Sequence, residues 1–134
     1  AEDVACLQDP DLNVSRSLFG KEGLTIEHLE PYELDDEDEI KLGQWTFKVI
    51  ATPFHTRGSC CFYVETEGVL FSGDTLFHLG IGRSDLPGSC PRETSSSLRK
   101  LAALPLSTKV YPGHGEMTSI KTELAFNEDL RQII

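Results

Sequence analysis

The chain has 134 residues, of which 39% are hydrophobic and 25% charged, and its formal net charge at pH 7 is −10. This length suits one domain with its own hydrophobic core, and the composition is that of a soluble globular protein. The acidic balance argues against nucleic acid or an anionic membrane as a main partner. No apolar run approaches the roughly 20 residues of a membrane span, and no signal peptide is seen.

The first 39 residues carry few signals of regular structure. Residues 2–7 look like the end of a helix, and a connector is expected over 11–20. A short strand is predicted over 25–29. The acidic run 33–39 lacks the alternating Asp spacing of a calcium loop, so we expect a solvated loop there.

Two pairs of strands are predicted in the middle of the chain. Residues 39–42 and 45–50 alternate polar with apolar side chains around Gly43, a pattern typical of a hairpin. Residues 59–64 and 69–72 form the second pair. Three side chains of the first pair share one face and are expected to pack in the core: Trp45, Phe47 and Val49.

The last third of the chain predicts two helices and a strand. Residues 91–93 open a helix, 109–111 form a short strand, and 118–133 form a closing helix. The inward side chains are expected to be Leu98, Leu101, Ala102 and Leu104 in the first helix, and Ile120, Leu124 and Leu130 in the second. No repeat or linker marks a second domain, so 1–134 is expected to form a single α/β domain.

The four cysteines do not form a disulfide framework. Cys60 and Cys61 are adjacent on a predicted strand, where their side chains point to opposite faces. Cys6 lies in the early helical stretch and Cys90 in a loop, and no CxxC spacing occurs. Reduced thiols favour a reducing compartment, so a cytoplasmic location is expected.

Three potential metal ligands each follow a predicted strand. His55 and His114 come at turns just after strands, and Asp74 follows Gly73 at the end of the apolar run 69–71. Strand ends deliver such side chains to loops at the edge of a sheet. Two imidazoles and one carboxylate are a set that suits a metal ion. The sequence therefore predicts a metal site built from His55, Asp74 and His114.

These residues lie within four motifs: T-P-x-H-T-x-G-S at 52–59, F-S-G-D-T-L-F at 71–77, G-x-G-R-S-D-L-P-G at 80–88, and Y-P-G-H-G at 111–115. In this order, they resemble the metallo-β-lactamase-fold hydrolases, and most of all the single-domain branch of the glyoxalase II-like (hydroxyacylglutathione hydrolase-like) enzymes. The resemblance implies an αββα sandwich. This chain resembles only its second, C-terminal half, a mixed sheet with flanking helices.

The same resemblance implies a metal-dependent hydrolase of thioesters. The complete family site holds two zinc ions, with iron as the alternative metal. His55 would bind the first ion and His114 the second, while Asp74 would bridge both and orient the nucleophile. A metal-bound hydroxide would attack a small-molecule thioester, for example a glutathione-derived one. In related enzymes a basic residue at the position of Arg83 contacts the thiol-bearing substrate; pairing of Arg83 with Asp85 to shape the loop is the alternative.

The chain departs from the family in one large respect, because the motif His-x-His-x-Asp-His is absent. Its histidines are His28, His55, His78 and His114, and no two are close in sequence. Residues 1–20 resemble the stretch that follows that motif in the family. Each ion would then have one His and half a carboxylate, whereas a catalytic zinc normally has three protein ligands. We expect weak metal binding and little catalysis unless a longer parent chain or a partner supplies the other half.

Further expectations concern neighbours of the ligands. Phe54 stands where the family has Gly, and its bulk is expected to narrow the pocket or alter the turn. His78 is adjacent to the site loop, where a surface position is favoured over a spare ligand, and His28 is expected at the surface.

Two other function classes stay open. One is a non-catalytic half that self-associates, or binds a complementing N-terminal half, through an exposed apolar sheet face. The other is a mononuclear iron enzyme of the persulfide dioxygenase type, which shares the fold. The loops at 86–88 and 111–115 look closer to those of the hydrolases.

Overall fold

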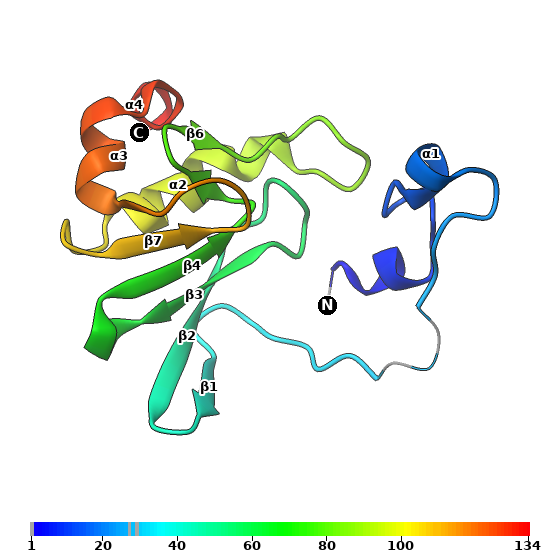
Figure 1. Cartoon of the computed structure of the whole chain (residues 1–134), viewed down its shortest axis with the longest axis horizontal. Helices are drawn as coiled ribbons and strands as arrows, with labels where there is room; N and C mark the ends of the chain where they lie inside the picture. Colours follow the sequence, from blue (N-terminus) through cyan, green and yellow to red (C-terminus); the bar gives the residue numbers. More distant parts are fainter. Residues whose placement is uncertain (1, 27, 29) are drawn as a thin grey trace.

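A mixed sheet forms the centre of the computed structural model, which describes residues 2–26, 28 and 30–134 (Figure 1). Among these residues, the sheet has six strands in the order β1-β2-β3-β4-β7-β8. The strands are β1 (Glu39–Leu42), β2 (Trp45–Ala51), β3 (Cys60–Val64), β4 (Val69–Gly73), β7 (Lys109–Pro112) and β8 (Thr118–Ser119). A separate hairpin pairs β5 (Leu76–Phe77) with β6 (Gly80–Ile81). Both predicted strand pairs are confirmed.

The first four strands form an antiparallel meander, and β7 then adds to β4 in parallel. A parallel neighbour requires a crossover, since the chain must return to the end where β4 began. Helix α2 (Thr94–Ala102) lies in that connection, preceded by a 3₁₀ turn, η3 (Pro91–Glu93). The crossover places the ends of β4 and β7 at the same edge of the sheet.

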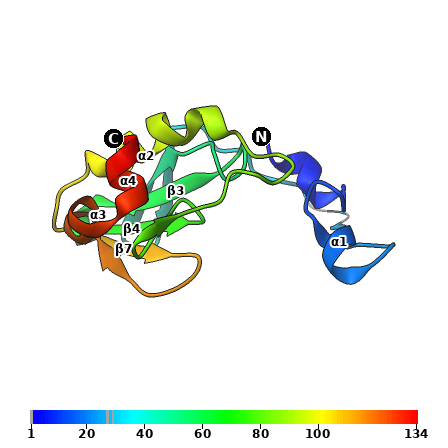
Figure 2. The same ribbon diagram turned by 90° about the horizontal axis from the view of Figure 1, so that it is seen from above.

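One face of the sheet is packed against helices. Leu98 and Leu101 of α2 are fully buried, as their helical spacing predicts. They share a core with alternate residues of the strands and with the two C-terminal helices, α3 (Ile120–Phe126) and α4 (Glu128–Ile133). The strand residues in this core include Ile50, Cys61, Tyr63, Leu70 and Val110. Figure 2 shows α2 and α4 above the strands.

The other face of the sheet exposes large apolar side chains. Phe47, Phe71 and Tyr111 stack across β2, β4 and β7, with ring centroids 6.1 Å and 5.8 Å apart. Trp45 is 42% exposed, whereas Val49 on the same face is buried. The prediction that Trp45 packs in the core is therefore wrong, because the described part of the chain leaves this end of the face uncovered. We call this surface the open face: its exposed side chains are Leu42, Trp45, Phe71 and Tyr111, and Phe47, which was also predicted to lie in the core, is half-buried beside Phe71.

The N-terminal segment projects away from the sheet in Figure 1. It contains a 3₁₀ turn, η1 (Val4–Leu7), close to the predicted helix end, and a short helix, α1 (Ser15–Phe19), where a connector was predicted. The strand predicted over 25–29 is wrong at Thr25, Ile26 and His28, while 27 and 29 lie outside the described residues.

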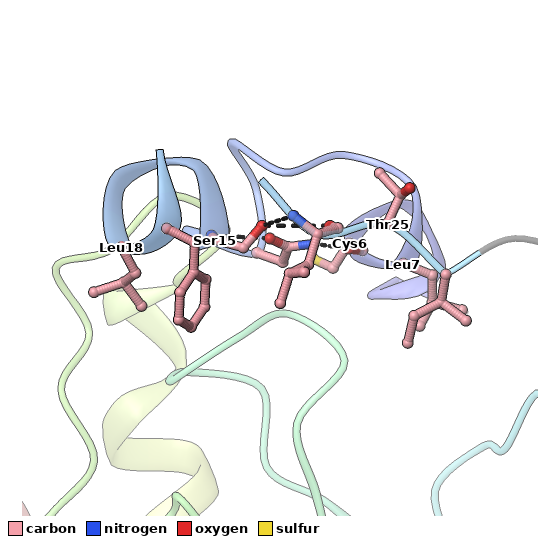
Figure 3. A pocket seen from close by; sticks show the side chains of 9 residues that line it. Cys6, Leu7, Ser15, Leu18 and Thr25 are labelled. Carbon is pink, nitrogen blue, oxygen red and sulfur yellow. Dashed lines mark hydrogen bonds between the residues drawn. The ribbon is translucent and has the colours of Figure 1, made fainter. Parts of the chain in front are cut away.

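A hollow of about 520 Å³ opens in the N-terminal segment. Leu7 and Leu18 line this hollow, and Figure 3 shows that their side chains point in the same direction. Leu18, Phe19, Leu24 and Ile26 are at least half exposed. This surface is thus a second apolar region without cover from the described chain.

The single closing helix predicted over 118–133 is divided in the structure. Thr118 and Ser119 form β8, and α3 ends at Asn127, whose backbone is extended with φ −77° and ψ 106°. The Asn127 side chain then caps α4 by accepting a hydrogen bond from Leu130 N. None of the helices in the described ranges is long and apolar enough to cross a membrane.

Candidate metal centre

Asp74 is placed at the sheet edge by the end of β4. Gly73 adopts φ +50°, a backbone conformation that residues with a side chain rarely adopt. The register between β4 and β7 shifts between Phe71 and Gly73. Gly113 N donates to Gly73 O at 2.8 Å. The parallel pairing of β4 with β7 thus brings Asp74 beside the loop that carries His114.

The two oxygens of Asp74 face different histidines. Oδ2 lies 3.5 Å from Nε2 of His55, and Oδ1 lies 3.3 Å from Nε2 of His114. The side chains of His55 and Asp74 are partly exposed, and that of His114 is 77% exposed. The structure therefore brings together all three residues that the sequence identified, with the carboxylate in the middle.

Two glycines allow this close approach. A Cβ atom on Gly113 would lie 2.6 Å from Oδ1 of Asp74, and one on Gly82 would lie 1.8 Å from the Asp74 carbonyl oxygen. Neither position can carry a side chain without moving the carboxylate or its backbone. The glycines of the motifs at 80–88 and 111–115 therefore contribute to the geometry around Asp74.

The ring of His55 is oriented by a backbone carbonyl. Its Nδ1 lies 2.8 Å from Arg83 O, so the ring nitrogen that faces Asp74 is Nε2. Histidines that bind metals commonly donate their other ring N–H to a carbonyl or carboxylate, which fixes the tautomer. The His55 geometry fits a ligand that binds through Nε2.

Hydrogen bonds to neighbouring segments hold the loop that carries His55. Ser89 Oγ donates to the His55 carbonyl oxygen at 2.7 Å. Asp3 in the N-terminal segment accepts hydrogen bonds from Gly58 N, at 2.9 Å, and from the hydroxyl of Thr56. The N-terminal segment is therefore attached to the loop that carries His55.

A buried pair of hydroxyl groups, missed by the sequence analysis, connects the loops of His55 and Asp74. Thr52 Oγ1 and Thr75 Oγ1 lie 2.9 Å apart, and both side chains are almost fully buried. Cys61 Sγ lies 3.5 Å from the Thr52 hydroxyl. The only signal in the sequence was the position of the two threonines, one at the end of β2 and one directly after Asp74.

Phe54 does not narrow the site. Its side chain is 0% exposed and belongs to the hydrophobic core, so the expectation of a narrowed pocket is wrong. Its backbone N–H donates to Thr52 O at 2.9 Å, and its carbonyl oxygen accepts a hydrogen bond from Cys90 N at 2.8 Å. The side chain points away from the ligands because the core accepts an aromatic ring at this position.

Arg83 is held by Asp85. Its Nε and one terminal nitrogen donate to the two Asp85 carboxylate oxygens at 2.7 Å and 2.8 Å. This hydrogen-bonded guanidinium keeps the pKa of the Asp85 carboxyl below its ordinary value. Both side chains are mostly exposed, and the pair shapes the loop after β6.

The donor set fits part of a metal centre. Two imidazole nitrogens and two carboxylate oxygens are ligands that zinc and iron accept. Within the described residues, however, no three His, Cys, Asp or Glu side chains are placed so that they could hold an ion by themselves. The geometry is that of a shared carboxylate with one histidine on each side.

Comparison with known proteins identifies the family. Residues 13–114 match the family model of the metallo-beta-lactamase superfamily. A hydroxyacylglutathione hydrolase of Maricaulis maris is 43% identical over 97 residues, which are 72% of this chain and 37% of that protein. A probable metallo-hydrolase of Bacillus subtilis, YqgX, is 37% identical over 87% of this chain and 55% of its own length.

Solved structures give the same result. The crystal structure of BLEG-1 B3 metallo-beta-lactamase superposes with a TM-score of 0.88 at 38% identity, covering 97% of this chain and 62% of that one. TTHA1623 in a di-iron-bound form gives a TM-score of 0.75 at 32% identity, covering 92% and 63%. The chain spans about half the length of curated relatives that it matches, 46% and 45% for two of them. By its sequence motifs and its fold, this chain belongs to the metallo-beta-lactamase superfamily, as a segment that corresponds to the C-terminal half of the fold.

Proposed function

We propose that this chain supplies one half of a two-metal centre that hydrolyses small-molecule thioesters. The observation that carries the proposal is the arrangement around Asp74, whose two oxygens face Nε2 of His55 and Nε2 of His114 from opposite sides. A carboxylate in this position suits two neighbouring ions, one beside each histidine. The name of the relative from Maricaulis maris supports the substrate class, and the di-iron neighbour supports a pair of metals.

In this proposal each residue has a defined task. His55, oriented by Arg83 O, and His114 would hold one ion each, and Asp74 would contact both. A protein-bound metal ion such as zinc can lower the pKa of bound water to about 7, which would supply a nucleophile at neutral pH. Arg83 would bind an anionic part of the substrate, either after breaking its hydrogen bonds with Asp85 or while keeping some of them. Zinc is the favoured metal and iron the alternative.

The remaining ligands would come from polypeptide outside this chain. A catalytic zinc normally has three protein ligands, and the described residues give one histidine and a shared carboxylate to each ion. The structural relatives are longer than this chain, so they contain polypeptide that it does not match. We propose that polypeptide of this kind, in cis or as a partner, covers the open face and completes the site.

The test joins this chain to the preceding part of the Bacillus subtilis relative and measures metal content and thioester hydrolysis. We expect two ions per joined chain and hydrolysis of a hydroxyacylglutathione thioester. Asp74→Asn should abolish turnover, while Asp129→Asn, a matched change of an exposed carboxylate on α4, should not. A folded joined protein that holds two ions and leaves the thioester intact would contradict the proposed substrate class.

A further inference from the structure

Glu123 is a carboxylate that the helical side of the protein buries completely. It lies on α3 and is 0% exposed. Oε1 accepts a hydrogen bond from the Thr118 hydroxyl at 2.5 Å and lies 3.3 Å from Nδ1 of His78. Oε2 accepts from the backbone N–H of Leu79 at 2.9 Å. Burial of a charge is costly unless hydrogen bonds replace its water shell, so these partners strongly favour one position of the carboxylate.

Asn127 completes this contact from the break between α3 and α4. Its Nδ2 donates both to Oε2 of Glu123, at 2.8 Å, and to the carbonyl oxygen of Gly80, at 3.0 Å. The turn of the β5–β6 hairpin is therefore held at the N–H of Leu79 and the C=O of Gly80. Figure 1 shows β6 next to α4.

The same hairpin touches each of the three candidate metal ligands. Asp74 precedes its first strand, and Gly82 N donates back to Thr75 O at 3.2 Å where the second strand ends. The next residue, Arg83, offers the carbonyl oxygen that orients His55. On the other side, the ring of Phe77 in β5 packs edge-on against His114, with centroids 6.1 Å apart.

We infer that Glu123, together with Asn127, is a positioning residue for His55 and Asp74, acting through the β5–β6 hairpin. The helices hold the turn of the hairpin, and the base of the hairpin presents the carboxylate of Asp74 and the Arg83 carbonyl. A shift of the turn therefore moves the groups that set both ligands. The inference rests on the proposed function only in treating these residues as metal ligands.

The test measures the tautomer of His55, which a merely structural role of Glu123 would leave unchanged. The chain has four histidines, so ¹⁵N-histidine labelling gives NMR signals from four imidazole rings. The signals that disappear in His55→Gln are those of His55. In the wild-type chain we expect His55 to carry its proton on Nδ1, because that nitrogen faces Arg83 O. In Glu123→Leu we expect a mixture of tautomers. Glu123→Gln, which retains an oxygen for Leu79 N–H, should keep most of the wild-type signal.

A second variant and a control make the result independent of folding defects. Asn127→Ser removes the amide that reaches Gly80 but leaves an oxygen that can cap α4. This variant should also give a mixture of His55 tautomers, and it replaces Glu123→Leu if that variant does not fold. Leu101→Ala removes core packing on α2 and should leave the His55 tautomer unchanged. The inference is overturned if His55 lacks the Nδ1–H tautomer in the wild type, or keeps it unchanged in folded Glu123→Leu and folded Asn127→Ser.

Cobalt titration separates this inference from the proposed function. If the chain binds Co²⁺, Glu123→Leu should weaken the affinity about 10-fold or more, the usual range for residues that support metal ligands. An unchanged affinity in the folded variant would overturn the positioning role. If the tautomer responds to Glu123 while the joined protein of the previous section binds no metal, positioning holds and the metal function fails.

Discussion

Nδ1 of His55 lies 2.8 Å from the carbonyl oxygen of Arg83, a residue 28 positions later in the chain. This contact joins the loop after β2 to the loop after β6, and it turns Nε2 of His55 toward Asp74. The ring of His114 faces Asp74 and packs edge-on against Phe77, and most of its side chain is in solvent. The two histidines therefore differ in how firmly this chain holds them.

This difference predicts unequal effects on folding stability. His55→Ala should lower the free energy of unfolding by about 0.5–1.5 kcal/mol, because a hydrogen bond to Arg83 O is lost. His114→Ala should change it by less than about 0.5 kcal/mol, since the side chain is mostly exposed. Urea unfolding of the metal-free chain measures both. Equal losses in the two variants would contradict the unequal support of the ligands.

The hydroxyl pair between Thr52 and Thr75 gives a second prediction. Thr75→Val should destabilise the chain by about 1–3 kcal/mol, because it leaves the buried Thr52 hydroxyl without its closest partner. The double variant Thr52→Val/Thr75→Val should lose less than the sum of the single variants, since both polar groups are then removed together. Additive losses in urea unfolding would mean that the two hydroxyls do not act as a pair.

The sequence predicted β1 to β4, β7 and α2 because their periodicity or apolar runs reflect burial, but not the two-residue strands β5, β6 and β8. The positions of Leu98 and Leu101 followed from helical spacing, and both are fully buried. By contrast, α1 is five residues long and follows Val14, which offers no polar capping atom; the Asn13 side chain, one residue earlier, accepts a hydrogen bond from Ser15 N instead. The break at Asn127 did carry a signal, since Asn is a good N-cap and Glu128 and Asp129 follow it.

The candidate site was predictable to a similar extent. His55, Asp74 and His114 occur in local motifs at strand ends, so their convergence followed from the order of the strands. Glu123 could not be found in this way, because its role depends on contact between α3 and a hairpin more than 40 residues earlier in the chain.

The exposure of Trp45 was missed for another reason. Alternation identifies the two faces of a strand but does not say whether this chain covers both.

The buried thiol of Cys61 predicts a loss of stability at alkaline pH. Burial raises its pKa from 9.0 to about 11, an effect that hydrogen bonds from Thr52 and Thr75 only partly offset. Below pH 9 the thiol is neutral in both the folded and the unfolded chain. Between pH 9 and 11 the unfolded chain loses this proton first, so the free energy of unfolding falls as the pH rises, by about 3 kcal/mol in total.

Urea unfolding across this pH range, with two variants, isolates the contribution of Cys61. Cys61→Ala should flatten the decline, although its stability at pH 7 is lower. Val110→Ala, which shortens another fully buried side chain of the same core, should keep the wild-type slope. If Cys61→Ala declines as steeply as the wild type, other groups cause the alkaline effect.

The open face predicts how the isolated chain behaves in solution. Phe71 lies at its centre, stacked between Phe47 and Tyr111 and 43% exposed, so the three rings present one continuous apolar surface to water. Surfaces of this kind mark sites of association. Phe71→Ser should therefore reduce self-association of the isolated chain, measured by sedimentation velocity over a range of concentrations. Leu106→Ser removes an apolar side chain that is more exposed, at 56%, but lies outside the open face, and it should not reduce self-association.

The same variant distinguishes self-association from completion by other polypeptide. If the open face normally receives preceding polypeptide, the joined protein should be monomeric, and Phe71→Ser should destabilise it, because the ring is then buried and its loss removes packing at the junction of two sheets. In the isolated chain the same substitution should lower the free energy of unfolding by less, since it loses only the stacking on Phe47 and Tyr111 and solvent already reaches 43% of the residue. A joined protein that still dimerises through Phe71 would show that the face serves a second copy instead.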